Sequence, residues 1–152
     1  MDAKNRVAIP SALKQQLPGE GKSPLVISRG LGKYLVIYTK ADWEVKLDGL
    51  MQLNQYSREN LDFIRRYTNG ATEISPDTAG RLLLPKFLTD FAGIDHKTTP
   101  DVVLNCVGNT IEVWEEKALN AILTDDTYDL EGQAEKLMGG VGLKVVKGGA
   151  DE

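Results

Sequence analysis

The sequence predicts a β-rich α+β protein made of two tandem repeats with short flanking helices. The stretch "DAKNRVAIP" at residues 2–10 recurs as "DTAGRLLLP" at 77–85, with Asp, Arg and Pro at the same spacing. Each stretch is followed by a short helical pattern and then by two β-branched runs around a glycine-containing turn. Each pair of runs is followed by another helical pattern, so the same structural unit is predicted to occur twice in the chain.

Size and composition indicate a folded protein of the cell interior. The chain has 152 residues, of which 41% are hydrophobic, which is enough to build a core. The single cysteine, Cys106, rules out an internal disulfide framework, which is typical of a reducing compartment. The sequence does not begin like a secretory signal, and no apolar stretch approaches the roughly 18 residues of a membrane span. We therefore expect a cytoplasmic protein.

The charge is unevenly distributed along the chain. The net charge is −4, but residues 1–72 carry +4 and residues 73–152 carry −8. Such an asymmetry between halves is a hint of a polyanionic partner. The alternative is that the acidic half simply keeps the protein soluble. Charge alone leaves both interpretations open.

The first repeat is expected over residues 1–54. A turn at 2–6 precedes a strand that ends at Pro10, and proline suits the first turn of the helix predicted over 11–17. Strands are predicted over 24–28 and 34–38, joined as a hairpin. A helix begins after Thr39, with Asp42 three residues later in a capping-box pattern. No strand precedes Asp2 in this sequence, whereas the second repeat has one at 71–75.

A linker helix is expected over residues 55–70. Ser57 is a suitable N-cap, Leu61, Ile64 and Tyr67 fall along one side, and Gly70 is placed to end the helix.

The second repeat is expected over 71–124. The strand at 71–75 and the strand after Arg81 are predicted to form the two arms of one hairpin. A helix is predicted over 86–94, strands over 101–105 and 110–114, and a helix after them. The remaining residues, 125–152, contain a helical pattern at 130–138 and a glycine-rich tail that we expect to be mobile.

The repeated motif is chemically that of a tight turn with an arginine at its exit. The side chain of Asp2 or Asp77 can accept hydrogen bonds from backbone N–H groups just ahead of it. Gly80 supplies the left-handed conformation that closes the turn, and Asn5, in the equivalent place, is the residue type that tolerates it best after glycine.

Two interpretations of the arginines follow from the turn. In one, Arg6 and Arg81 form exposed salt bridges with their own turn aspartates, each worth roughly 0–1 kcal/mol. In the other, the aspartates set the direction of guanidinium groups that reach phosphates or guanine edges of DNA. The residues themselves do not decide between the two.

The doubled motif, with the tryptophan-bearing helix starts "ADWE" and "EVWEE", resembles the MraZ family over about residues 2–140. The resemblance implies a double-split, swapped-hairpin β-barrel of the AbrB/SpoVT type, assembled into a ring-shaped homo-oligomer. It implies a nucleoid-associated transcriptional regulator that binds repeated DNA boxes upstream of the division and cell-wall gene cluster. The chain departs from the family in having Asn5 for the usual glycine and in lacking the first leading strand, which bears on ring assembly.

The resemblance also implies the partners and the site. The family's DNA-contacting motif falls here on Asp2, Lys4, Arg6, Asp77 and Arg81. The expected partners are double-stranded DNA and further copies of the chain, with no cofactor, metal, small-molecule substrate or membrane. An antitoxin-like protein-interaction or assembly module on the same barrel is the alternative function. An enzyme has least support, because no catalytic constellation is apparent.

The remaining chemically active residues favour structural roles. His96 is the only histidine and cannot anchor a histidine-rich metal site. Cys106 lies in a predicted strand and is expected to be a buried, inert thiol. Trp43 and Trp114 are expected in the core. The acidic stretch 125–131 lacks the spacing of a calcium loop and is interpreted as a solvated connection.

Overall fold

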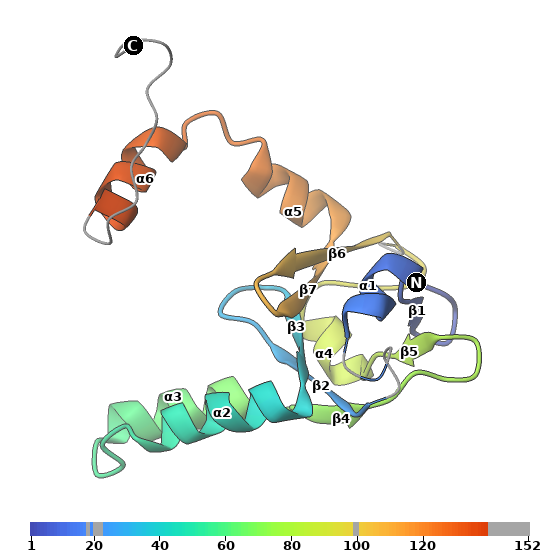
Figure 1. Cartoon of the computed structure of the whole chain (residues 1–152), viewed down its shortest axis with the longest axis horizontal. Helices are drawn as coiled ribbons and strands as arrows, with labels where there is room; N and C mark the ends of the chain where they lie inside the picture. The colour runs from blue at the N-terminus through green and yellow to red at the C-terminus, as the bar shows by residue number, and fades with distance from the viewer. Residues whose placement is uncertain (18, 20–22, 99–100, 140–152) are drawn as a thin grey trace. The chain divides into compact units, whose positions relative to one another are not determined.

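The computed structural model describes residues 1–17, 19, 23–98 and 101–139 (Figure 1). The chain divides into two units, Met1–Leu119 and Asn120–Glu152. The strands of the described residues are β1 (Arg6–Ala8), β2 (Leu25–Arg29), β3 (Leu35–Thr39), β4 (Thr72–Ile74), β5 (Arg81–Leu83), β6 (Val102–Val107) and β7 (Thr110–Glu115). The helices are α1 (Ser11–Gln16), α2 (Lys40–Met51), α3 (Arg58–Thr68), α4 (Lys86–Phe91), α5 (Glu116–Leu123) and α6 (Leu130–Met138).

The strands form two antiparallel sheets alongside the helices, which confirms the predicted α+β class, although more of the described residues lie in helices than in strands. β1 and β5 form a two-stranded sheet, and the other strands form a five-stranded sheet in the order β4-β2-β3-β7-β6. Within the described residues neither sheet closes into a barrel, so the swapped-hairpin barrel stays a prediction. No helix in this part of the chain is both long and apolar enough to cross a bilayer.

The two repeats exchange strands. β5 pairs with β1 of the first repeat, and β4 pairs with β2 of the first repeat. The prediction that β4 and β5 are the arms of one hairpin is therefore wrong. The turn between β4 and β5 forms, but the two strands enter different sheets. These sheets pack against each other, so Ile74 of β4 and Leu82 of β5 are buried in the same core.

The strand register shows that the repeats are related by an approximate two-fold axis. The β1–β5 ladder is centred on Val7 opposite Leu82, which occupy the same place in the two repeats. The β3–β7 ladder is centred on Val36 opposite Glu112, which are again equivalent. Antiparallel pairing of equivalent residues is what a local two-fold axis produces, so both ladders join the repeats symmetrically.

The five-stranded sheet is covered on both faces. One face packs against the β1–β5 ladder and α4, through the cluster Val7, Leu25, Ile27, Leu35, Ile37, Ile74, Leu82, Leu84, Leu88, Ala92, Ile94, Ile111 and Val113. The other face packs Val26, Val36 and Tyr38 against Trp43 of α2 and Tyr67 of α3. Figure 1 shows α2 and α3 as an antiparallel pair. The prediction that Trp43 is a core residue is confirmed.

The predicted helix boundaries agree with the structure where a cap defines them. Thr39 accepts a hydrogen bond from the Asp42 amide at 3.1 Å, and Ser57 caps α3 in the same way. Gly70, with φ of +87°, follows the end of α3 as predicted. The tail that was expected to be mobile lies outside the described residues from 140 onward.

The outer edge of β6 is the place where the two-fold arrangement is incomplete. By the repeat equivalence, a strand directly before Asp2 would pair with β6 as β4 pairs with β2. No strand of the described residues occupies that edge. Val107 is 51% exposed and Cys106 is exposed, so the prediction of a buried thiol is wrong. The physical reason is that Cys106 lies near the end of β6, which pairs only with β7 among the residues that the structure describes.

Hydrogen exchange tests this difference between equivalent strands. The amides on the outer edge of β6 should exchange with deuterium faster than the amides of β2 that face β4, because edge amides lack strand partners. Residue-resolved exchange measured by NMR on the full chain reports both strands in one sample. Equal protection of β2 and β6 would mean that another segment is paired to β6.

Candidate nucleic-acid interface

The two turns of the repeated motif have the same hydrogen-bonded construction. The Asp2 amide donates to the Arg6 carbonyl at 3.0 Å, and the Asp77 amide donates to the Arg81 carbonyl at 2.8 Å. Asp2 Oδ1 accepts from the amides of Lys4 and Arg6, both at 2.9 Å. Asp77 Oδ1 accepts from the equivalent amides, also at 2.9 Å. The predicted use of the aspartates as backbone acceptors is confirmed.

The residue before each arginine is left-handed, as the sequence predicts. Asn5 has φ of 62° and Gly80 has φ of 77°. Sequence reasoning missed that the Asn5 side chain joins the repeats. Its amide donates to Oγ1 of the buried Thr89 at 3.0 Å and to the Leu84 carbonyl at 3.3 Å. Asn5 therefore both closes its turn and satisfies a polar group in the other repeat.

Arg6 and Arg81 come together because of the β1–β5 ladder. Side chains alternate along a strand, so Val7 and Leu82 enter the core while Arg6 and Arg81 lie on the opposite face. Each arginine binds its own aspartate through Nε, at 2.9 Å for Arg6–Asp2 and 3.2 Å for Arg81–Asp77. Each also reaches the other turn through Nη1, at 3.8 Å for Arg6–Asp77 and 3.7 Å for Arg81–Asp2.

We call these four side chains, Asp2, Arg6, Asp77 and Arg81, the paired-turn cluster. Their side chains are 25–36% exposed, so the cluster lies at the surface. The hydrogen bond from the Arg6 amide, followed by other donors and the Arg6 charge, holds the pKa of Asp2 below its usual value despite some desolvation. The Arg81 amide does the same for the pKa of Asp77. Both aspartates are therefore ionised at neutral pH.

The cluster has donors beyond its own ion pairs. Its two guanidinium and two carboxylate groups balance in charge, and the exposed Lys4 beside it adds one positive charge. A guanidinium carries five N–H donors. Among the described residues, each arginine donates its side-chain hydrogen bond to its own aspartate through Nε, and its contact with the other turn's aspartate is longer, at 3.7–3.8 Å from Nη1. The arrangement can thus offer two oriented sets of N–H donors to an acceptor outside the protein.

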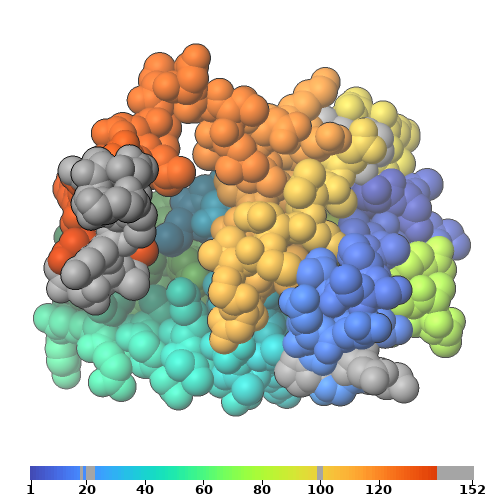
Figure 2. All heavy atoms as spheres, turned by 45° about the horizontal axis from the view of Figure 1, so that its top comes forward, coloured from blue at the N-terminus to red at the C-terminus, as the bar shows by residue number. Residues whose placement is uncertain are grey.

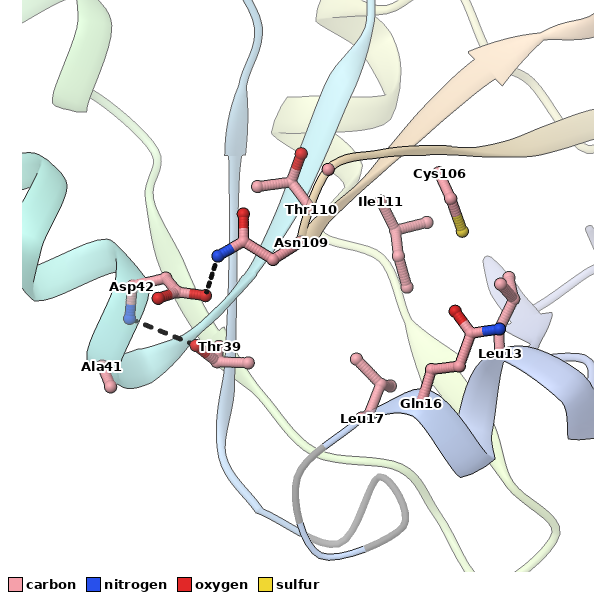
Figure 3. Close-up of a pocket in the computed structure, with 11 residues that line it drawn as sticks. Leu13, Gln16, Leu17, Thr39, Ala41, Asp42, Cys106, Asn109, Thr110 and Ile111 are labelled. Atoms are coloured by element: carbon pink, nitrogen blue, oxygen red, sulfur yellow. Dashed lines mark hydrogen bonds between the residues drawn. The ribbon is translucent and has the colours of Figure 1, made fainter.

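A separate hollow of about 460 Å³ lies between α1, the start of α2 and the β6–β7 hairpin (Figure 3). Asn109 in the hairpin turn donates to Asp42 Oδ2 at 3.1 Å, which ties the hairpin to α2. Figure 2 shows the same hairpin, in gold, on the surface above the cyan atoms of α2. Cys106 lines this hollow with Leu13 of α1 and with Leu17, which follows the helix.

The hollow does not gather a catalytic set. His96 lines a different hollow, beside Lys4 and Asn5, so it is not a partner for Cys106. No group of three or more histidine, cysteine, aspartate or glutamate side chains suited to hold a metal occurs among the described residues. Of the five residues predicted for the site, the fold brings Asp2, Arg6, Asp77 and Arg81 together, and Lys4 lies exposed within the first turn.

Known proteins resemble this chain along most of its length. Residues 1–63 and 68–139 match the family described as "MraZ protein, putative antitoxin-like". A protein named "Transcriptional regulator MraZ" from Christiangramia forsetii is 38% identical over 140 residues, covering 91% of this chain and 88% of the relative. A protein of the same name from Flavobacterium psychrophilum is 34% identical over 142 residues, covering 93% and 88%.

The left-handed Asn5 gives a prediction about stability. Replacing Asn5 by Ala should destabilise the protein by about 1–3 kcal/mol, because it leaves strain at a positive φ and removes a donor from buried Thr89. Asn5→Gly should cost less, because it removes the donor but relieves the strain. Urea unfolding of the two variants gives the comparison. Equal losses would show that backbone strain at Asn5 is unimportant.

The lowered pKa values of Asp2 and Asp77 give a prediction about acid stability. Their stabilising effect is present above the unfolded value of 3.8 and is lost as the pH falls through the lower folded value. The double variant Asp2→Asn/Asp77→Asn should therefore lose less stability than the parent between about pH 5 and pH 3. Urea midpoints at the two pH values measure this loss.

The matched control is Asp48→Asn, which changes an exposed carboxylate on α2. It should retain the parent's acid sensitivity. If the double variant also retains it in full, the paired-turn cluster does not contribute to the acid dependence.

Proposed function

The chain belongs to the MraZ family, and from that membership we propose that it is a transcriptional regulator that binds specific double-stranded DNA through the paired-turn cluster. The names of its relatives support a regulatory role. The single observation that carries the DNA-binding proposal is the meeting of Arg6 and Arg81 on one exposed face, each held by two aspartates. A face of this kind suits acceptors on phosphates and guanine edges.

Each residue of the interface has a defined part in the proposal. Arg6 and Arg81 contact the DNA, and Asp2 and Asp77 fix the direction of their guanidinium groups. Lys4, exposed beside the first turn, adds a phosphate contact. Because the aspartates cancel much of the local charge, one cluster binds weakly. Specific binding then depends on several clusters that reach repeated DNA boxes at once.

We propose that the protein self-associates into a ring and acts on the nucleoid in the cytoplasm, at boxes upstream of the division and cell-wall gene cluster. Exposed apolar side chains on and between α2 and α3 support self-association. They are Val45, Met51, Leu53, Tyr56 and Phe63. The strand exchange between repeats supports a swapped-hairpin core, which a strand paired to the edge of β6 would extend. No cofactor or small-molecule substrate has a part in this function.

An antitoxin-like protein-interaction module is the second candidate. The description of the matching family includes that term, and the edge of β6, which no strand of the described residues occupies, is a surface on which another protein can add a strand. This candidate predicts a stable protein partner and no salt-dependent retention on DNA. The DNA experiment below therefore separates the two functions.

The DNA proposal predicts a loss of binding on removal of either guanidinium. Arg81→Ala and Arg6→Ala should each weaken binding to the DNA upstream of the protein's own gene by about 1–3 kcal/mol per cluster engaged. The parent's affinity should fall steeply with salt, because phosphate contacts release counterions. Fluorescence anisotropy at several salt concentrations, with unrelated DNA of equal length as competitor, measures both effects.

The control is Arg58→Ala, which removes an equal charge from the exposed start of α3. It should leave the specific affinity almost unchanged. If Arg81→Ala and Arg58→Ala behave alike at every salt concentration, the paired-turn cluster is not the DNA-reading element.

A further inference from the structure

We propose that a hollow at the end of β2 binds a phosphate group, independently of the paired-turn cluster. The hollow has a volume of about 610 Å³ and is lined by Arg29, Asp62, Arg65, Arg66, Thr68 and Asn69. Three guanidinium groups and one carboxylate leave a net charge of +2 in its lining. The single carboxylate, Asp62, already accepts from Arg66 Nε at 3.0 Å. The excess charge therefore belongs to Arg29 and Arg65.

Arg29 is held in place by aromatic rings. Its guanidinium carbon lies 4.6 Å from the ring centre of Phe91 and 5.7 Å from that of Phe87, both on α4. Cation–π contacts of this kind fix the plane of a guanidinium. They use its face, so the N–H donors at its edge can still form hydrogen bonds. Arg29 is half-buried, so its guanidinium loses part of its hydration.

The guanidinium of Arg29 has fewer hydrogen-bond acceptors among the described residues than it has N–H donors. Its Nε is buried, and no hydrogen-bond acceptor for it is found among the described residues. Arg29 and Arg65 also make no salt bridge with any side chain in that part of the structure. A buried donor without an acceptor costs about 1–3 kcal/mol. Because the buried Nε is closed to solvent, a tetrahedral oxyanion in the hollow would bridge Arg29 and Arg65 through their Nη groups.

The chemistry of the lining selects a phosphate rather than a carboxylate or a halide. Guanidinium groups bind phosphate through two parallel N–H···O bonds to two of its oxygens, a geometry that chloride, a single atom, cannot match. Several guanidinium groups around one hollow match the three or four oxygens of a phosphate better than the two of a carboxylate. The exposed Arg65 and Arg66 make the hollow accessible to a free phosphate or to a phosphate of a polymer.

The test uses the full-length protein labelled with ¹⁵N. Inorganic phosphate is titrated at constant ionic strength while the Arg29 Nε–Hε signal is followed by NMR, with chloride as the matched anion. Phosphate should shift this signal saturably and chloride should not. Arg65→Gln should weaken phosphate binding about tenfold, the loss expected for one charge-assisted contact. No saturable shift, or an equal shift with chloride, would overturn the proposal.

Two variants guard against a general charge effect. Arg58→Gln removes the same charge from the other end of α3, outside the hollow, and should retain the parent's phosphate affinity. Arg29→Lys retains the charge but loses the planar fork, and should bind more weakly than the parent. Equal affinities of the Arg65→Gln and Arg58→Gln variants would also overturn the site.

A further experiment distinguishes a phosphate of the DNA backbone from a free phosphate compound. If it is the DNA backbone, Arg65→Gln should reduce the salt slope of DNA binding by about one, with Arg58→Gln as the reference. If it is a free phosphate compound, Arg65→Gln should leave that slope unchanged and still weaken phosphate binding. Because the NMR titration contains no DNA, it can succeed or fail separately from the proposed DNA-binding function.

Discussion

The three-residue ladder between β1 and β5 is the constraint on which the candidate interface depends. It buries Val7 opposite Leu82 and so turns Arg6 and Arg81 to the same outer face. Neither strand has another partner among the described residues, so each depends on the other for its strand–strand hydrogen bonds. The ladder therefore couples core packing to the surface site. A substitution that weakens the Val7–Leu82 contact would separate the two arginines without touching either of them.

The turn aspartates explain how an acidic protein can present arginines without a strongly basic surface. One oxygen of Asp2 organises the turn backbone, and the other binds Arg6 Nε and lies near Arg81 Nη1. The guanidinium groups thereby lose much of their conformational freedom before any ligand arrives, which lowers the entropic cost of binding. The same ion pairs reduce the long-range attraction of one cluster for a polyanion. Orientation and the number of clusters then matter more than net charge.

Local features of the fold were predictable from the sequence, whereas the partners of strands were not. Thr39 and Ser57 mark helix starts through hydrogen bonds to residues three positions ahead, and such contacts depend only on neighbouring residues. The sequence around β4 indicates a strand but does not say which strand it will join, because both β2 and β5 carry apolar residues that could face it. Cys106 was misjudged for the same reason, since its burial depends on a neighbour of β6. The contact between Asn5 and Thr89 spans 84 residues and had no local signal.

The two repeats share the residues that form the ladders around the two-fold axis. They differ at surface positions that take no part in these ladders. The turn, the arginine and the central apolar pair recur because each is needed to form one ladder with the other repeat. Arg29 and Cys106 occupy equivalent places near the ends of β2 and β6, yet one faces the aromatic rings of α4 and the other lines the hollow beside α1. A duplicated unit can change such positions in one copy without disturbing the ladder. The arginine-lined hollow beside Arg29 therefore has no counterpart at Cys106 among the described residues.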